Sequence, residues 1–167
     1  MNFKTERLEI RPISEEDREA VLDLLTNATV ARTYMLPEYP GREEAEPLFH
    51  RLVQLSADEN RYVAGVYYHG QFIGMMNDTE MKDRQIEMGY AYLPAFYNRG
   101  FATEAFSGAI EYLLNHGFEK VLAGAFSNNA ASLRVMEKCG MQKLEYADTV
   151  DYRGVTYDCV YYAATKK

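Results

Sequence analysis

One stretch of this sequence, residues 85–118, constrains the fold more than any other. Its first part, residues 85–93, is rich in Ile, Met, Tyr and Gly and ends before Pro94, a composition typical of a strand. From Ala102 onward, apolar residues recur at the spacing of an amphipathic helix. The run YNRGFATEA at residues 97–105 joins the two segments, so the sequence predicts a strand, a glycine turn and a helix in that order.

A turn of this kind favours binding of an anion. The first backbone N–H groups of a helix have no partner within the helix, and the positive end of the helix dipole lies beside them. Gly100 lets the backbone approach a ligand closely, and the small Ala102 leaves room at the first helical turn. The sequence therefore predicts an anionic ligand, such as a phosphate, at this helix start. A purely structural role for Gly100 stays open, because glycine is common in turns.

The composition predicts a single folded domain over residues 1–167. Of these residues, 47% are hydrophobic and 26% are charged, as in ordinary globular proteins. The sequence lacks an apolar run of the roughly 20 residues that cross a bilayer, and its first residues lack the apolar core of a signal peptide. We therefore expect a cytoplasmic protein that has no membrane partner.

The formal net charge of −7 argues against nucleic acid as a partner, because neutralising phosphates needs clustered Lys and Arg. Acidity could attract a cationic acceptor, although it also serves solubility alone. Cys139 and Cys159 lie in no metal-binding pattern, so we expect two buried, reduced thiols and no metal. The histidines His50, His69 and His116 show no partner in the sequence, and we assign them no catalytic role.

Strands and helices alternate along the rest of the chain. Strands are expected at residues 8–10, 62–68, 72–76 and 121–126, and helices at 15–25, 48–55 and from about 129 to 139. Residues 33–47 are rich in Pro and are expected to form a loop with short helical pieces. Long strand-like stretches at 144–150 and 157–164 flank Tyr152-Arg153-Gly154. The pattern predicts a mixed α/β sheet that ends in a β-hairpin.

Two common phosphate-binding patterns are absent, since the sequence has no GxxxxGK[ST] and no GxGxxG after its first strand. Residues 97–102 (YNRGFA) instead resemble motif A of the GNAT N-acetyltransferase superfamily, Q/R-x-x-G-x-G/A, with Tyr97 at the first position. Residues 129–141 (NAASLRVMEKCGM) resemble N-x-x-S-x-R-V-x-E-K-x-G-F of the branch that acetylates ribosomal-protein N-termini. The opening TERLEIRP at residues 5–12 resembles the start of that branch, so the likeness covers nearly the whole chain.

This resemblance implies the GNAT fold, an α/β architecture whose mixed central sheet has a splayed edge, helices on both faces and a terminal β-hairpin. It also implies acetyl-CoA as the ligand, with its pyrophosphate on backbone N–H groups of the turn and its pantetheine arm beside residues 88–93. The residues that are implied to contact acetyl-CoA are Tyr92, Leu93, Asn98, Arg99, Gly100, Phe101, Ala102, Thr103, Asn129 and Ser132.

The implied reaction is direct attack of a neutral amine on the acetyl thioester. The family stabilises the tetrahedral oxyanion with a strand N–H, which falls near Leu93 in this chain. The amine must lose a proton, and Glu87 on the same strand is the first candidate for the base. Asp151 and Glu145 compete with it, and an exposed strand glutamate is the alternative reading of Glu87.

Ser132 is the candidate that the resemblance offers for assisting the leaving thiolate. Many family members place a Tyr seven residues after the Asn that starts this helix, where this chain has Met136. Ser132 would donate its hydroxyl proton or orient a water, and an ordinary helix-surface serine is the alternative. Asn129 is implied to bind the pantetheine amide, and it also suits the N-cap of the helix.

The acceptor is left open among several classes of amine. The resemblance favours a protein N-terminal amine, while polyamines, aminoglycosides and free amino acids stay as alternatives because residues 31–59 carry much of the acceptor choice. A noncatalytic acyl-CoA sensor is the alternative from another class, and a homodimer stays open. The tyrosines considered for the walls of the acceptor pocket are Tyr34, Tyr39, Tyr90, Tyr92, Tyr97 and Tyr152.

Overall fold

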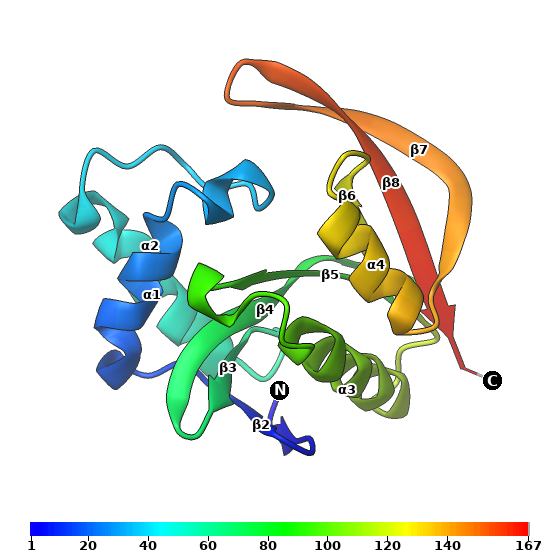
Figure 1. The fold of residues 1–167 in the computed structure, drawn as a ribbon. Helices are drawn as coiled ribbons and strands as arrows, with labels where there is room; N and C mark the ends of the chain where they lie inside the picture. The colour runs from blue at the N-terminus through cyan, green and yellow to red at the C-terminus, as the bar shows by residue number, and fades with distance from the viewer. Residues whose placement is uncertain (167) are drawn as a thin grey trace.

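The core of the protein is an eight-stranded mixed sheet with the strand order β1-β2-β3-β4-β5-β6-β8-β7 (Figure 1). The computed structural model describes residues 1–166. The strands are β1 (Phe3–Lys4), β2 (Leu8–Arg11), β3 (Ala64–Tyr68), β4 (Gln71–Lys82), β5 (Gln85–Tyr92), β6 (Lys120–Phe126), β7 (Gln142–Tyr152) and β8 (Val155–Thr165). The α-helices are α1 (Arg18–Leu25), α2 (Arg42–Ala57), α3 (Phe101–Asn115) and α4 (Ala130–Lys138), and short 3₁₀ turns η1 (Glu15–Asp17), η2 (Val30–Arg32) and η3 (Pro94–Phe96) connect them.

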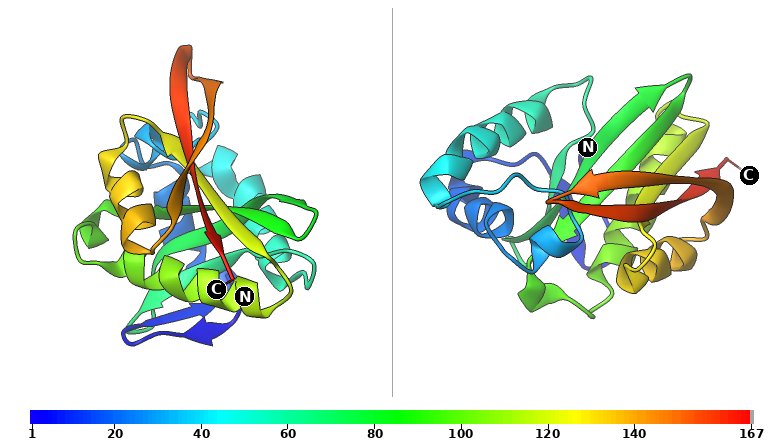
Figure 2. Two further views of the ribbon diagram at one scale, coloured as in Figure 1. Left: turned by 90° about the vertical axis from the view of Figure 1, so that its right-hand side faces the viewer. Right: turned by 90° about the horizontal axis from the view of Figure 1, so that it is seen from above.

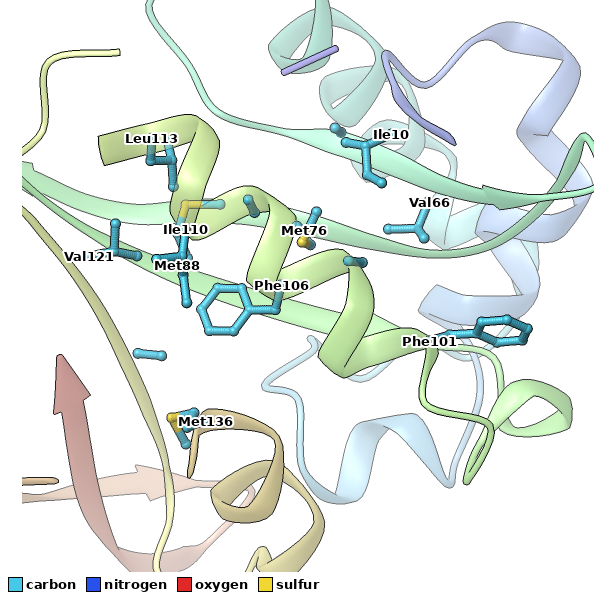
Figure 3. Close-up of a cluster of buried hydrophobic side chains, with 14 of the residues drawn as sticks. Ile10, Val66, Met76, Met88, Phe101, Phe106, Ile110, Leu113, Val121 and Met136 are labelled. Atoms are coloured by element: carbon cyan, nitrogen blue, oxygen red, sulfur yellow. The ribbon is translucent and has the colours of Figure 1, made fainter. Parts of the chain in front are cut away.

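Two pairs of helices cover opposite faces of the sheet. Buried side chains of α3 and α4 pack with one face of the strands, and those of α1 and α2 pack with the other (Figure 1). Figure 3 shows the first of these cores, where Phe106 on α3 lies with Met88 of β5 and Met136 of α4. Because successive strand residues point to opposite faces, β5 contributes Met88 to one core and Ala91 to the other.

The sheet is splayed between β5 and β6, its one parallel pair of neighbours. The two strands are in register from Gln85↔Lys120 to Glu87↔Leu122. Beyond that point β5 continues to Tyr92 and β6 to Phe126 without pairing with each other, while the other edge of β6 pairs with β8 along its whole length. This gap lies beside the N-terminus of α3, and the splayed edge predicted from the sequence is confirmed.

The strands β7 and β8 form a long antiparallel hairpin that projects from the sheet (Figure 2, left). Its two-residue turn has Arg153 and Gly154 in the left-handed region, at φ 51° and 77°. Its tip returns to the chain that precedes α2: the Tyr152 hydroxyl donates to the Ala31 carbonyl at 2.7 Å and accepts from the Leu36 N–H at 3.2 Å. The predicted terminal hairpin is therefore present, and it is anchored at its tip.

Three elements differ from the prediction. Helix α2 begins at Arg42 although residues 33–47 were expected to form a loop, because its first turn is acidic and complements the helix dipole. Pro47 lies inside this helix and forgoes one backbone hydrogen bond there. Strand β4 runs on to Lys82, well past Met76, and the short strand β1 was not predicted at all.

Candidate functional site

Helix α3 begins with a left-handed Gly100 at its N-cap, at φ 78° and ψ 2°. No side chain caps this end of the helix, and its first backbone hydrogen bond runs from the Glu104 N–H to the Gly100 carbonyl at 3.0 Å. The N–H groups of Phe101, Ala102 and Thr103 precede that bond. The preceding residues 97–100 are exposed. The turn thus presents helical N–H groups to solvent, which is the geometry of an anion site.

Glycine is required at position 100 for two reasons. A left-handed backbone strains any residue that carries a Cβ. A Cβ at Gly100 would also lie 3.3 Å from a guanidinium nitrogen of Arg7. The left-handed backbone and the nearby Arg7 both favour a residue without a side chain at position 100, which leaves the surface of the turn open for a ligand.

Arg7 ties the start of the chain to this turn. Its Nε donates to Oε2 of Glu104 at 2.6 Å, and its Nη1 donates to the Arg99 carbonyl at 3.1 Å. Glu104 also accepts from the Arg7 backbone N–H at 2.7 Å and from the Thr5 hydroxyl at 2.6 Å. Burial works to raise the pKa of Glu104, but these donors outweigh it and hold that pKa below its ordinary value. No local pattern in the sequence predicts this role of Thr5, Arg7 and Glu104, because Arg7 and Glu104 lie 97 positions apart.

Arg99, a predicted ligand of the pyrophosphate, lies exposed at the same turn. Its guanidinium carbon is 4.8 Å from the centroid of the Phe101 ring and 5.2 Å from that of Tyr68. Stacking on two rings holds the charge beside the N-terminus of α3 while its N–H edge stays accessible. Arg7 is paired with Glu104, so it is Arg99 that makes the turn locally cationic in a protein whose net charge is −7.

The backbone N–H groups near Leu93 point to alternate sides of β5. The Leu93 N–H donates to the Ile73 carbonyl at 2.9 Å, so it faces β4 and not the gap. In an antiparallel ladder, successive residues direct their backbone groups to alternate sides. Tyr92 and Tyr90 pair with Gly74 and Met76 of β4 and therefore direct their N–H groups toward β6. Near Leu93, the N–H directed to the gap is therefore that of Tyr92, and the sequence alone does not reveal which N–H groups of a strand face which neighbour.

Helix α4 faces the gap from the other side through its N-terminus. The Asn129 side chain caps the helix and accepts from the Ser132 N–H at 3.2 Å. The Ser132 hydroxyl lies 2.8 Å from the Tyr90 hydroxyl of β5. Burial raises the pKa of Tyr90 to about 12. Met136, which occupies the position of the family's tyrosine, is fully buried in the core (Figure 3).

Glu87 lies on the opposite side of β5 from Met88, toward the face that α1 and α2 cover. It lines an open cavity of about 280 Å³ together with Glu80, Lys82, Asp83, Gln85 and Leu122. Burial raises the pKa of Glu87, the Thr79 hydroxyl partly offsets this, and the charge of Glu80 adds to it. A half-buried carboxylate with a raised pKa suits a group that accepts a proton.

The two competing acids belong to the hairpin. Asp151 is exposed and accepts a hydrogen bond from the Thr156 hydroxyl of the facing strand. Glu145 is exposed in the part of β7 where the register with β8 shifts, between Lys143 and Ala147. Glu145 lines a separate open cavity of about 500 Å³, and Asp151 lines neither cavity. Among the three candidates Glu87 is half-buried, whereas Glu145 and Asp151 are exposed.

The six tyrosines do not form one pocket. Tyr34 donates to Oδ1 of Asn77 at 2.7 Å and lies with Tyr39 among the residues packed by α1 and α2. Tyr90 and Tyr92 belong to the other core, and Tyr97 is exposed in the α3 turn. Tyr152 anchors the hairpin tip. Of the six, Tyr34, Tyr39 and Tyr152 lie on the same side of the sheet as Glu87.

The two cysteines do not belong to a metal site or a disulfide in the part of the chain that the structure describes. Cys159 is buried, Cys139 is half-buried, and both are free thiols. Within residues 1–166 there is no cluster of three or more His, Cys, Asp or Glu side chains suited to a metal ion. Over the same range, no helix is both long enough and apolar enough to span a membrane.

These features define an α/β protein with an anion-binding helix start beside a gap in its sheet, and with a half-buried carboxylate across the same strand. Residues 7–142 match the family model for the acetyltransferase (GNAT) domain. The chain belongs to this family, and it is an acyltransferase. The family membership inferred from the sequence motifs is confirmed.

Individual relatives agree with this assignment. The uncharacterized N-acetyltransferase YoaA of Bacillus subtilis is 28% identical over 98% of this chain and 96% of its own length. The spermidine N-acetyltransferase of Vibrio cholerae, solved with CoA and spermine, superposes with a TM-score of 0.80 at 18% identity, covering 95% of each chain. A Salmonella typhimurium acetyltransferase that modifies the N-terminal serine of ribosomal protein L7/L12 has a TM-score of 0.82 at 16% identity, covering 98% of this chain and 97% of its own.

Proposed function

We propose that this protein transfers the acetyl group of acetyl-CoA to a primary amine by direct attack on the thioester. The observation that carries the proposal is the gap between β5 and β6, which opens beside the uncapped N-terminus of α3. An extended pantetheine arm has the length and the amide groups to pair with a strand edge, and a pyrophosphate suits a helix start. The solved relative from Vibrio cholerae contains CoA, which supports this donor.

The donor site uses backbone groups for most of its contacts. The N–H groups from Asn98 to Ala102 and the Thr103 hydroxyl hold the pyrophosphate, with Arg99 beside them. The pantetheine arm runs along the free edge of β5, and Asn129 contacts its amide while capping α4. Main-chain donors bind the anion locally, so an acidic protein needs no positive surface for this purpose.

Two groups of β5 and one of α4 carry the chemistry. The Tyr92 N–H, directed into the gap, stabilises the oxyanion that forms when the amine attacks. Glu87 takes a proton from the ammonium through a relay of waters, because it lies five residues along β5 from Tyr92, about 16 Å away. Only the neutral amine is a nucleophile. Ser132 donates a hydrogen bond to the sulfur as CoA leaves.

A protein N-terminal amine is the acceptor that the motif at residues 129–141 favours, and the Salmonella relative modifies such a group. A small cationic amine is the second candidate, because three of the six residues that line the Glu87 cavity are acidic: Glu80, Asp83 and Glu87. Acidic walls favour a cation over a neutral acceptor. We further propose that residues 1–167 act as one domain and that the protein works in the cytoplasm.

The test is a turnover assay with acetyl-CoA against N-terminal peptides, polyamines, aminoglycosides and amino acids, following release of the CoA thiol. Turnover with one class identifies the acceptor. If CoA binds tightly and no amine releases the thiol, the protein is an acyl-CoA sensor and the proposed catalysis is wrong. If CoA does not bind, the donor site itself is refuted.

A further inference from the structure

The hydroxyl of Tyr90 on β5 makes two polar contacts with Ser132 of α4, one with its hydroxyl and one with its carbonyl oxygen. We infer that Tyr90 is a positioning residue, which fixes the Ser132 hydroxyl so that its proton points to the sulfur of the departing CoA. This inference rests on the proposed function, because it concerns the leaving group of the same reaction. It deepens that function by assigning a second side chain to the thiolate.

The geometry holds the tyrosine hydroxyl in one place. Tyr90 projects from β5 toward α3 and α4, and its ring centroid is 4.9 Å from that of Phe106. Its hydroxyl is 2.8 Å from Oγ of Ser132 and 3.4 Å from the Ser132 carbonyl oxygen. A packed ring on a strand is a rigid support, whereas a serine hydroxyl on a helix rotates freely unless a partner fixes it.

The Tyr90 hydroxyl has one proton and two acceptors within reach, Oγ of Ser132 at 2.8 Å and the Ser132 carbonyl oxygen at 3.4 Å. In this scheme Tyr90 donates that proton in the shorter contact, to Oγ. If Tyr90 donates, Oγ of Ser132 accepts and the serine keeps its own proton free for another partner. Burial raises the pKa of Tyr90 to about 12, so its hydroxyl keeps this proton at neutral pH.

No proton has to leave Tyr90 or Ser132 in this scheme. The C–S bond of the tetrahedral intermediate breaks, and its electron pair goes to sulfur as a thiolate. An ordinary thiol pKa near 8.5 makes this thiolate a tolerable leaving group, and a single oriented hydrogen bond lowers its energy further. The proton that the amine lost passes to Glu87 and from there to solvent, and the CoA thiolate takes up a proton from solvent after release.

The Tyr90–Ser132 pair also supplies a phenol that α4 lacks, since this chain has Met136 at the position of the family's tyrosine. Met136 is fully buried and has no hydroxyl, so α4 alone cannot place a phenol at the sulfur. The phenol comes instead from β5 and acts through the short side chain of Ser132. The main alternative is that Tyr90 merely ties α4 to the sheet.

A matched control separates the two readings. Tyr162 of β8 also holds α4 by its hydroxyl, which donates to Oε1 of Glu137 at 3.1 Å. Tyr162→Phe removes a tether of the same helix without touching Ser132. If tethering were the role of Tyr90, the two Phe variants would behave alike.

The test is the pKa of the CoA thiol when CoA is bound, read from the ultraviolet absorbance of the thiolate as the pH is raised. A hydrogen bond from Ser132 lowers this pKa, so Ser132→Ala and Tyr90→Phe should each raise it by about one unit, the effect of one hydrogen bond to a charged group. The double variant should match Ser132→Ala alone, and Tyr162→Phe should match wild type. In turnover, Tyr90→Phe should lower kcat about tenfold and leave the KM for acetyl-CoA unchanged.

Each outcome decides the matter. An unchanged thiol pKa in Tyr90→Phe, additive effects of Tyr90→Phe and Ser132→Ala, or an equal effect of Tyr162→Phe would overturn the inference while the proposed function stands. Calorimetry on the same samples measures CoA binding. If wild type does not bind CoA, the proposed function fails and the inference fails with it.

Discussion

The Tyr152 hydroxyl lies 2.7 Å from the Ala31 carbonyl oxygen, although 120 residues separate the two in the chain. This contact joins the tip of the β7–β8 hairpin to the segment between α1 and α2. Arg153 reinforces it with hydrogen bonds to the carbonyls of Leu36 and Pro37, both at 3.2 Å. Seen from above, the hairpin crosses over the sheet toward that segment (Figure 2, right). The hairpin tip and the segment between α1 and α2 thus form a bridge whose two ends are far apart in sequence.

Removing this bridge should affect the acceptor and not the donor. Tyr152→Phe loses the hydrogen bonds to Ala31 and Leu36, and we expect a stability loss of about 1–3 kcal/mol. The KM for the amine should rise severalfold while the affinity for CoA stays unchanged. Tyr157→Phe is the control, because Tyr157 lies in the same hairpin and stacks on Phe126 of β6, with a centroid distance of 4.2 Å. Equal effects on both substrates would contradict this role of the bridge.

The α3 turn should tolerate no side chain at Gly100. Gly100→Val places a Cβ in a left-handed residue and crowds Arg7, so CoA affinity measured by calorimetry should fall at least about tenfold, a loss of roughly 1.4 kcal/mol. Gly70→Val is the matched control, since Gly70 has φ 77° and open space around it. Both variants should lose similar stability and remain folded. Normal CoA affinity in Gly100→Val would refute the anion site.

Glu104 should stabilise the fold through its hydrogen bonds with Thr5 and Arg7. Glu104→Ala releases Arg7 and Thr5, and because Arg7 is partly exposed we expect a loss of only about 1–2 kcal/mol of stability. The folded-state pKa of Glu104 is lowered, so its contribution is present above the ordinary pKa and is lost as the pH falls through the lowered value. Glu111→Ala, at an exposed position of the same helix, is the control. Thermal unfolding from neutral to acid pH measures the difference, which should vanish only at the acid end.

Glu87→Gln should lower kcat about a hundredfold if the carboxylate takes the proton from the amine. Because burial raises the pKa of Glu87, the acidic limb of kcat/KM should lie above the ordinary glutamate range near 4.3. The variant should lose this limb and keep its CoA affinity. Glu119→Gln, at an exposed glutamate paired with Arg84, is the control. A rate equal to that of wild type would remove Glu87 from the mechanism.

The same carboxylate should destabilise the fold at neutral pH. A folded-state pKa above the unfolded value means that the folded protein binds the proton more tightly, so its stability falls as the pH rises through the raised pKa. Glu87→Gln should therefore have a higher Tm than wild type at pH 7 and an equal Tm below the unfolded pKa of about 4.3. A pH series of melting curves checks the sign, and a lower Tm at neutral pH would contradict it.

Local patterns were enough to predict much of the fold. The strand, turn and helix at residues 85–118, the terminal hairpin and the order of the remaining elements follow from hydrophobic periodicity and turn residues, which act over a few positions. The start of α2 was missed because Pro47 breaks the pattern without breaking the helix. The two-residue strand β1 is too short to show any periodicity.

The candidate site was predictable only where a single segment builds it. Gly100 and the helix that follows form a local unit, so the anion site could be expected from the sequence. The direction of the Leu93 N–H depends on its register with Ile73, and the role of Arg7 depends on Glu104, 97 residues further on. The pairing of Tyr90 with Ser132 depends likewise on how α4 packs against β5. Such relations arise from tertiary packing, and no spacing rule reports them.

The bare N-cap of α3 has a consequence beyond catalysis. Since Gly100 supplies no side-chain acceptor, an anion that binds there becomes the missing cap of the helix. By mass action, a ligand at one hundred times its Kd adds about 2.7 kcal/mol to the free energy of unfolding. A cell that is rich in the acyl donor would then keep more of this enzyme folded than a starved one, so that metabolic supply would set not only its rate but also its lifetime.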